Sequence, residues 1–524
     1  MINISYRHFP NVSLPPPIDW RQNPFDSKNW VHHFLSLRWL YDHDNATKLW
    51  VLEDFLAWLD NDSEARSYVS GRKRDHTSAI RLGVLVDCLQ DELDEPTSQR
   101  VRREIDETIT ELIDTSTYKT GHNHGLLIDE ALLRTAARLP DAISPDRLRR
   151  VLLRLSDQLR ALFDDEGFTR EHSISYQEYN LLTLQRIDAL LSGFDPSFVA
   201  PIRGRINAIR EATPRLLGNA LRRNNQYIPF GDSFRTPKES ALKHVYGTDK
   251  PLELLRQYAR DQSSFVAPEA GFGFFRNRDW HFGITSSNNV GSHKQADELS
   301  VFVEYRGFVA IDDPGYTDAL DDLKDTAKKR EAHSTIRLYD GQDEVSCETL
   351  RRPNARWVEE FGKDGLEGFV ARAELQNGGF LWRLIAHMEP HGILIVDFAN
   401  PGCTDSLETI HRFVLGTREL ATTARPYSVR TGARPSISCL NGASIDTSGY
   451  MEVVGDRSDM SEMRSWVEWR GRTGQPMAFL VAPHTRSEHP ITVGLDGNED
   501  IVIGEIHGRV WRLAADTCAA ISEG

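Results

Sequence analysis

Three short segments carry side chains that are able to move a proton. Residues 121–125 read GHNHG, residues 171–179 read EHSISYQEY, and residues 291–297 read GSHKQAD. Together they supply an amide, several imidazoles and a phenol. Imidazole and phenol groups act as acids and bases because their neighbours tune their proton affinities. The set fits an elimination at a carbon beside a carboxylate, which needs one group to neutralise the carboxylate, a base and an acid.

The first segment precedes a predicted helix. Backbone N–H groups and the helix dipole favour an anion at that end of a helix. Asn123 or His124 is therefore a candidate for neutralising the substrate carboxylate. The alternative is structural, with Asn123 capping the helix and His124 packing locally.

The second segment offers Tyr176 as a catalytic phenol. If Ser173 or Ser175 begins a helix, His172 and Tyr176 bracket its first turn and converge on one cleft. Two interpretations of His172 stay open: it contacts substrate, or it orients Tyr176 through a hydrogen bond. A tyrosine at helical spacing is also a common core residue.

These segments must be positioned by two different kinds of structure. From Trp30 to about Leu217 apolar residues recur with helical spacing, and each periodic run ends at Gly, Pro, Asp or Ser. The pattern predicts an all-α half built of antiparallel helical hairpins. The predicted helices are Trp30–Tyr41, Ala46–Leu59, Thr77–Leu93, Thr97–Thr115, Gly125–Arg138, Pro145–Phe163, Ser175–Leu191 and Pro201–Leu217.

After about Phe265 the pattern changes to short apolar or alternating runs bounded by turn residues, such as GILIVDFA and MAFLVAP. Asp340-Gly341 and Asp496-Gly497 are hairpin dipeptides. The second half is therefore predicted to be an antiparallel β-sandwich. We expect a helical domain over 1–235, a linker over 236–264 and the sandwich over 265–524.

The order and the residues of these segments resemble those of the heparinase II/III-like family, from about Trp20 to at least Asp397. Members carry an Asn-His-Gly element in the active cleft, matched here by Asn123 and His124. They also carry a Glu-His-Ser-Pro-x-Tyr motif, in which Ile174 replaces the proline here and Tyr176 is the tyrosine. The resemblance implies an incomplete α/α toroid followed by an antiparallel β-sandwich. It also implies a lyase that cleaves uronic-acid polysaccharides or oligosaccharides by β-elimination.

The third segment matches a family motif in the sandwich. Members show His-x-His-x-Asp, then an Asp-Pro-Gly-Tyr-like turn at Asp313–Tyr316, then His-Asn-Thr at His333–Thr335. By this resemblance His293 assists the tyrosine in acid/base work or positions substrate. It would reach across a domain interface, where ligand sites are common.

One departure concerns a metal. In several relatives the second histidine of this motif, the aspartate of the turn and the later histidine hold a structural ion, commonly zinc. Here Gln295 replaces that histidine and is a poorer zinc ligand, so Asp313 and His333 are at most a partial site. No cofactor is required for the chemistry, and a hydrogen-bonded cluster of these residues is expected in place of zinc or another divalent ion.

The remaining site predictions come from positions that resemble the family cleft or lie beside its motifs. The predicted substrate-binding residues are His172, Arg81, Asp232 and Lys294. Trp20 and Trp50 resemble cleft positions, but most tryptophans are packing residues.

Composition limits the partners. The chain has 524 residues, 62 basic and 77 acidic side chains and a formal charge of −15, which argues against a general nucleic-acid binder. The expected partner is an acidic polysaccharide or oligosaccharide, and oligomeric state is left open. No apolar run of about eighteen residues predicts a membrane span. The first residues lack a secretory pattern, so a cytoplasmic location is expected, or a periplasmic or secreted one if a signal was removed.

Two alternatives stay open. One is a glycoside hydrolase on the same scaffold, which needs two carboxylates around the scissile bond, with Asp164, Asp165, Glu166 and Glu171 as candidates. The other is a non-catalytic exopolysaccharide-binding protein. A new C4–C5 double bond in the product would distinguish the lyase from both.

Overall fold

The structure is a computed structural model of the chain. It describes the following residues: 2–6, 9–71, 73–90, 93–114, 116, 118–260, 263–287, 293–317, 321–341, 343–345, 356–363, 365–375, 378–402, 407–417, 420–422, 428–431, 435–441, 443–454, 461–483, 491–495, 501–505, 510–513 and 522–523. Gly291 and Ser292 of the third segment and both residues of the predicted hairpin dipeptide Asp496-Gly497 lie outside these residues.

The chain divides into two compact units. The first unit comprises 1–167 and 179–211, and the second comprises 168–178 and 212–524. The segment that carries Tyr176 therefore groups with the residues of the β-rich half. The expected linker, 236–264, contains two short helices that were not predicted, α10 (Glu239–Tyr246) and α11 (Pro251–Arg260).

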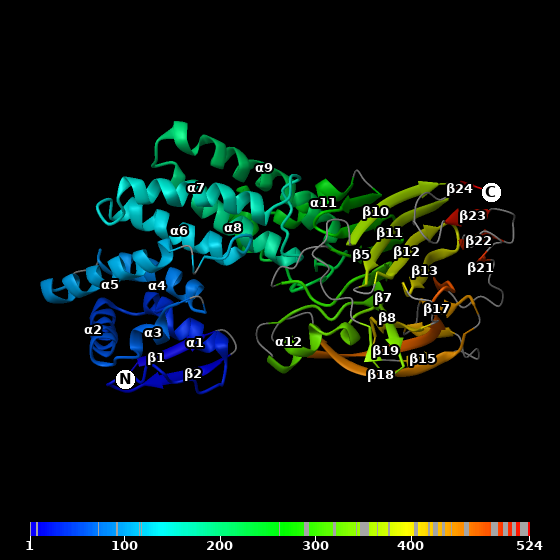
Figure 1. The fold of residues 1–524 in the computed structure, drawn as a ribbon, viewed down its shortest axis with the longest axis horizontal. Helices are drawn as coiled ribbons and strands as arrows, with labels where there is room; N and C mark the ends of the chain where they lie inside the picture. Colours follow the sequence, from blue (N-terminus) through cyan, green and yellow to red (C-terminus); the bar gives the residue numbers. More distant parts are fainter. Residues whose placement is uncertain are drawn as a thin grey trace. The chain divides into compact units, whose positions relative to one another are not determined.

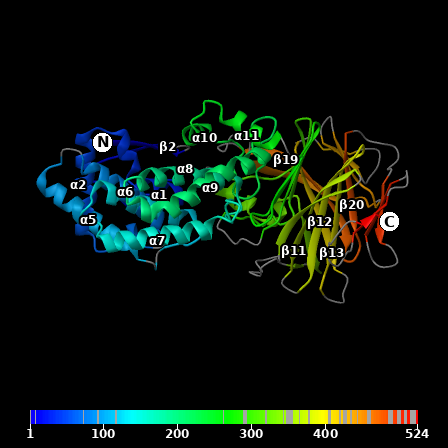
Figure 2. The same cartoon turned by 90° about the horizontal axis from the view of Figure 1, so that it is seen from above.

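The first half is helical, as expected, and Figures 1 and 2 show α6 (Asn123–Arg138) and α7 (Pro145–Leu162) side by side. It begins with an antiparallel hairpin, β1 paired with β2, that the sequence analysis did not predict. The elements up to the start of the sheets are β1 (Ile2–Tyr6), β2 (Phe9–Leu14), α1 (Lys28–Leu35), η1 (Arg38–Asp42), α2 (Asn45–Asn61), α3 (Ala65–Val69), α4 (Asp75–Cys88), α5 (Glu95–Ile113), α6 (Asn123–Arg138), α7 (Pro145–Leu162), α8 (Ile174–Leu191), α9 (Pro196–Ala220), α10 (Glu239–Tyr246) and α11 (Pro251–Arg260).

Local sequence explains the helix ends. The Ser144 side chain accepts a hydrogen bond from the Arg147 N–H at the start of α7, and Pro145 occupies the first turn. Asp94 caps α5 in the same way by accepting from the Thr97 N–H at 2.7 Å.

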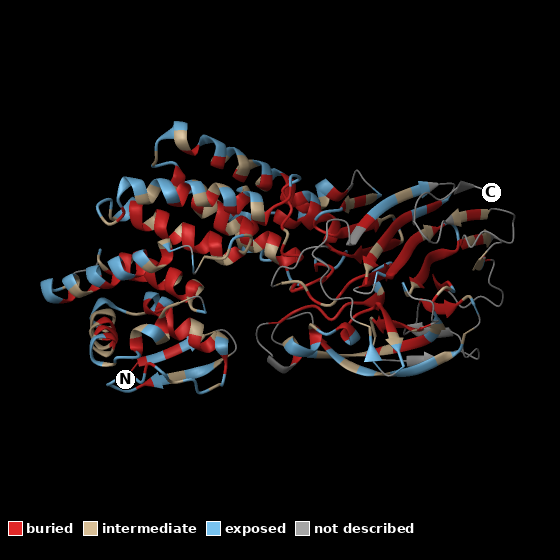
Figure 3. Cartoon of the chain, in the orientation of Figure 1, coloured by how far each residue is buried: buried red, intermediate tan, exposed pale blue. Residues whose placement is uncertain are grey.

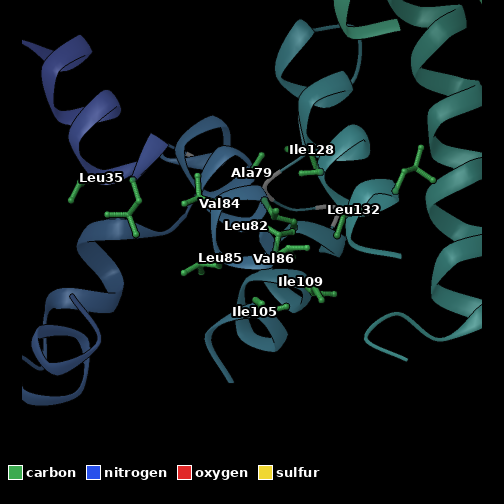
Figure 4. Packing of buried hydrophobic residues seen from close by; sticks show 14 of the residues in the cluster. Leu35, Ala79, Leu82, Val84, Leu85, Val86, Ile105, Ile109, Ile128 and Leu132 are labelled. Atoms are coloured by element: carbon green, nitrogen blue, oxygen red, sulfur yellow. The ribbon is translucent and has the colours of Figure 1, made fainter. Parts of the chain in front are cut away.

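The core of the first unit forms where apolar stripes of neighbouring helices meet. Figure 4 shows Leu82 and Leu85 of α4 among Ile105 of α5 and Ile128 and Leu132 of α6, all of them buried. This packing fixes α4, which carries Arg81, and α6, whose N-terminal end carries Asn123 and His124.

The second half consists of antiparallel sheets. Among the described residues one sheet has the order β10-β11-β12-β13-β20-β17-β16-β15. Another has the order β18-β19-β14-β7-β6-β5-β4-β3, with β8 paired to β14 and β9 paired to β8. A smaller sheet has the order β21-β22-β23-β24. The bounds from β3 onward, with the intervening helical turns, are β3 (Ser264–Ala267), β4 (Phe272–Arg276), β5 (Trp280–Thr285), β6 (Val301–Tyr305), β7 (Phe308–Asp312), α12 (Asp321–Ala327), η2 (Arg330–Ala332), β8 (Ile336–Asp340), β9 (Asp343–Glu344), β10 (Arg356–Lys363), β11 (Leu366–Glu374), β12 (Phe380–Met388), β13 (Gly392–Asn400), β14 (Glu408–Leu415), β15 (Leu420–Thr422), β16 (Ser428–Thr431), β17 (Ser436–Cys439), β18 (Ile445–Val454), β19 (Ser461–Arg472), β20 (Met477–Ala482), β21 (Ile491–Leu495), β22 (Ile501–Glu505), β23 (Val510–Leu513) and β24 (Ser522–Glu523).

Strand β12 shows how the sheets form layers. Leu381 and Ile385 point into the core shared with the ten-stranded sheet, while Trp382 and Leu384 pack with Trp511 of the small sheet. Because side chains alternate along a strand, one strand contributes to two cores. Strands β12 and β13 are therefore buried along nearly their whole length, drawn in red in Figure 3. Within the described residues no helix is long and apolar enough to cross a membrane.

Candidate active site

Three backbone segments of the second unit meet around Tyr176 and His293. Ser173 Oγ donates to the Asp232 carbonyl at 2.8 Å, and the Asp232 N–H donates to the His293 carbonyl at 2.9 Å. Gly231 joins them in the left-handed region, with φ 63°, and a Cβ there would lie 2.0 Å from the His172 carbonyl oxygen. Only glycine fits this approach without displacing a segment.

The rings of Tyr176 and His293 stack face to face. Their centroids are 3.3 Å apart and their planes are 18° from parallel. Tyr176 lies in the first turn of α8, where its N–H donates to Ser173 Oγ at 3.3 Å. The structure therefore brings the predicted phenol and the predicted imidazole of the second unit together.

Two buried carboxylates face the two ring nitrogens of His293. Its Nδ1 lies 3.3 Å from Asp232 Oδ2, and its Nε2 lies 3.5 Å from Glu171 Oε1. The Glu171 and Asp232 side chains have only 1% and 2% of their surface exposed. Sequence reasoning assigned Glu171 only to the hydrolase alternative; its place in the EHSISYQEY motif was the available signal.

Asp232, a predicted substrate-binding residue, is committed to protein partners. Its Oδ1 accepts from Gln295 Nε2 at 3.0 Å, and its Oδ2 lies 3.2 Å from Lys328 Nζ. These contacts, with that to His293, make Asp232 a support for the stacked pair.

His172 and Lys294, also predicted to bind substrate, lie inside the second unit. The two His172 ring nitrogens contact the Ala270 carbonyl at 3.1 Å and Thr285 Oγ1 at 2.8 Å, and the side chain has no exposed surface. Lys294 Nζ donates to Glu298 Oε1 at 2.7 Å. Neither position presents its polar group to solvent.

Asp297 holds His172 and Lys294 together. Burial alone would raise the pKa of Asp297, but the charges of His172 and Lys294 outweigh burial and hold that pKa well below its usual range. The ionised Asp297 carboxylate thus holds His172, four residues before Tyr176, and Lys294, the residue after His293.

Asn123 and His124 lie together in the first unit, at the start of α6. His122 is the N-cap residue, and its Nδ1 accepts from the His124 N–H at 3.1 Å, so the capping role does not fall to Asn123. His124 Nδ1 lies 3.0 Å from Asp75 Oδ1, and Lys119 Nζ lies 3.0 Å from Asp75 Oδ2. The N-terminus of α6, with the Asn123 amide and the His124 imidazole, therefore lies close to the Lys119 ammonium group.

Sequence reasoning missed two further histidines of the first unit. The His76 ring lies 4.3 Å from the His32 ring and 4.8 Å from the His124 ring, between centroids. Burial, followed by the nearby His32 and His124, holds the pKa of His76 well below its usual value, so His76 is neutral. The Asp75-His76 dipeptide at the start of DHTSAIRLG is the sequence feature that could have indicated His76.

Arg81, the predicted substrate-binding residue of the same helix α4, is buried. Its guanidinium donates to the carbonyls of Leu35 at 3.3 Å and Val69 at 3.2 Å. In this position it ties α4 to two preceding segments of the backbone.

The residues of the possible metal site are largely committed to hydrogen bonds. Asp313 Oδ2 accepts from Ser300 Oγ at 2.8 Å and contacts His333 Nδ1 at 3.0 Å, and Gln295 is bonded to Asp232. Among the described residues, His333 Nε2 and Gln295 Oε1 are the buried atoms here without a hydrogen-bond partner. One imidazole, one carboxylate and an amide oxygen do not fit a zinc site.

No protein-family model matches the sequence, and no curated protein matches it. The fold, in contrast, is similar to solved structures. Heparinase III matches with TM-score 0.69 and 13% identity over 95% of this chain and 85% of that chain. A second heparinase III structure gives 0.62 and 14% over 95% and 87%.

Heparan sulfate lyase HepC from Pedobacter heparinus matches with TM-score 0.58 and 14% identity over 99% of this chain and 86% of that chain. The expected fold class and the expected resemblance are thereby confirmed at the level of the fold. The chain has the heparinase III fold, an incomplete α/α toroid followed by an antiparallel β-sandwich.

Proposed function

We propose that this chain is a lyase that cleaves uronic-acid-containing polysaccharides or oligosaccharides by β-elimination. The observation that carries the proposal is the stacked Tyr176–His293 pair, a phenol and an imidazole held at 3.3 Å between centroids. The similarity of the fold to heparinase III and HepC supports a lyase. The substrate class follows from the chemistry that these side chains are suited to perform.

Each residue has a role in this reaction. Tyr176, as phenolate, takes the proton from C5, and the C4–O bond breaks while the C4–C5 double bond forms. The phenol then returns its proton to the departing glycosidic oxygen, so protons and electrons balance. Asn123 and His124 neutralise the uronate carboxylate, which lowers the barrier to removing the C5 proton. His293 assists Tyr176.

The experiment is incubation of the full chain with a panel of heparan sulfate, hyaluronan, alginate and oligosaccharides derived from each. Ultraviolet absorbance of the new unsaturated uronate and release of reducing ends are followed in parallel. Absorbance that rises together with reducing ends supports elimination and names the substrate. Reducing ends without absorbance would support the hydrolase alternative, and silence in both assays would favour a binding protein.

A further inference from the structure

We propose that a cluster of arginines in the second unit binds the sulfate or carboxylate groups of an acidic glycan, away from the bond that is cleaved. The arginine cluster consists of Arg223, Arg256, Arg276 and Arg278. The inference rests on the proposed function for the identity of the ligand. Guanidinium groups suit such a ligand because their N–H donors form a planar fork that matches paired anionic oxygens.

Hydrogen bonds to the backbone bring the arginine cluster together. The turn after α9 packs against the turn between β4 and β5, where the Arg223 side chain donates to the Arg278 carbonyl. The Arg256 side chain, on α11, donates to the Arg223 carbonyl at 3.3 Å. The Arg276 side chain, at the end of β4, donates to the Leu221 carbonyl. Arg223 and Arg278 are exposed, so the arginine cluster is open to solvent.

Carboxylates do not balance the charge of the arginine cluster. In the part of the chain that the structure describes, none of its four side chains forms an ion pair, and three neighbouring carboxylates pair with other residues. These pairs are Glu304 with Arg222 at 2.7 Å, Asp279 with Arg306 at 2.8 Å and Glu253 with Lys250 at 3.1 Å. Arg306 holds the pKa of Asp279 below its usual value, and the charges of Arg278 and Arg223 contribute to this lowering. One carboxylate thus faces three arginines, and such an excess of positive charge attracts anions.

Arg276 is the member of the arginine cluster most affected by this excess. Among the described residues, its Nε is buried without a hydrogen-bond partner. The pKa of Arg276 falls to about 10, mainly because of burial, while Glu304 opposes the shift. The charges of Arg223 and Arg256 contribute to the same lowering. The arginines therefore repel one another, and a bound anion would offset that repulsion.

The arginine cluster lies at the opposite end of β4 from the segment that carries Tyr176. His172, four residues before Tyr176, stacks on Phe272, the first residue of β4, with centroids 4.9 Å apart. Arg276 is the last residue of that strand, and four residues of a strand span about 13 Å. A glycan of several sugars is long enough to contact both places, so the arginine cluster would hold a part of the chain remote from the cleaved bond.

The test measures binding of heparin oligosaccharides, which carry sulfate, and hyaluronan oligosaccharides, which carry only carboxylate, by calorimetry at low salt. The protein is the full chain with Tyr176→Phe, so that no glycan is cleaved. Adding Arg223→Gln together with Arg278→Gln should weaken binding of at least one glycan about tenfold, the scale of a charge-assisted hydrogen bond. The corresponding lysine substitutions should recover part of the affinity.

Arg470→Gln is the matched control, because Arg470 is an exposed arginine of the same unit that pairs with Glu408 and Asp446. It should leave both affinities unchanged. Arg278→Gln alone, at an exposed side chain, keeps the test valid if the double variant fails to fold. Unchanged affinity for both glycans in the folded glutamine variants would overturn the inference. So would cluster-dependent binding of a DNA oligonucleotide of equal charge that is tighter than the binding of either glycan.

Turnover separates this inference from the proposed function. On a long glycan that the wild type cleaves, the double glutamine variant should raise KM by a factor similar to its loss of affinity. It should raise KM less on an oligosaccharide too short to reach the arginine cluster. Elimination with an unchanged KM on the long glycan would retain the proposed function and refute the inference. Cluster-dependent glycan binding by a wild-type chain that cleaves nothing would do the reverse.

Discussion

Tyr176 and His293 lie with their rings stacked at 3.3 Å between centroids, although they come from a helix start and from a distant loop. The arrangement depends on hydrogen bonds between three segments of the second unit, around Gly231 and Asp232. Because the pair is the centre of the proposed chemistry, changes that move these segments should affect turnover as strongly as changes to the rings.

Asn123 is predicted to neutralise the substrate carboxylate. Asn123→Ala should lower kcat by roughly a hundredfold or more, the effect of losing one preorganised donor, and Asn123→Asp should lower it further by adding a like charge. Asn45→Ala changes an exposed asparagine at the first position of α2 and should keep the wild-type rate. Turnover on the identified substrate is the measurement, with thermal melting as a check because Asn123 is buried. Wild-type kcat in both Asn123 variants would remove this residue from the mechanism.

Gly231 is predicted to be essential for the site. An alanine there needs a left-handed backbone and places its Cβ 2.0 Å from the His172 carbonyl. Gly247 has φ 60° but nothing within 4 Å of the added Cβ, so Gly247→Ala should cost only about 1–2 kcal/mol of backbone strain. Gly231→Ala should lose substantially more stability in denaturant unfolding. Equal losses in the two variants would show that the close approach is unimportant.

Glu178 should make stability depend on pH. Burial raises the pKa of Glu178 from 4.5 to about 7, more than Lys238 lowers it. The folded chain therefore keeps a proton that the unfolded chain releases, and the free energy of unfolding falls as pH rises from 4.5 to about 7. The loss is on the order of 3 kcal/mol.

Glu178→Gln removes this loss while keeping an acceptor for the Lys238 N–H, which lies 2.6 Å from Glu178 Oε1. The variant should melt at a higher temperature than the wild type above pH 7 and at a similar temperature near the lower end of that range. Glu253→Gln, at an exposed carboxylate paired with Lys250, serves as the control. Parallel melting profiles for wild type and Glu178→Gln would contradict the assignment.

The cluster of Gln295, Asp313 and His333 should not bind zinc in the wild-type chain. Asp313 and His333 contact each other, and Gln295 adds only an amide. A chelator is therefore expected to leave the wild-type melting temperature unchanged, whereas Gln295→His supplies a second imidazole and should add zinc-dependent stability. One equivalent of tightly bound zinc in the wild type that is lost in Asp313→Ala, measured by elemental analysis, would contradict this prediction.

Periodicity was sufficient to predict most of the fold. The stripe through Val151, Leu155 and Leu159 placed a helix over 145–163, and α7 spans Pro145–Leu162. Asp340-Gly341 placed a hairpin where β8 pairs with β9. The β1–β2 hairpin was missed because its strands are short and partly exposed, with polar residues interrupting the alternation.

The site was predicted less completely, for a physical reason. Local motifs singled out Tyr176 and His293, and the structure brings them together. The contacts of His293 with Glu171 and Asp232 depend on long-range hydrogen bonds between loops, which no local pattern encodes. Arg81 and His172 were predicted to bind substrate, but both are buried and contact backbone carbonyls. A polar residue within a motif can therefore have a structural role.

The role of Tyr176 in elimination is tested by comparing wild type with Tyr176→Phe in the unsaturated-uronate assay. Phenylalanine retains a ring for stacking on His293 and removes only the phenolic oxygen. We expect rising absorbance for the wild type and a loss of at least about a hundredfold in the variant, with unchanged melting. A Tyr176→Phe variant that forms the unsaturated product at the wild-type rate would contradict that role.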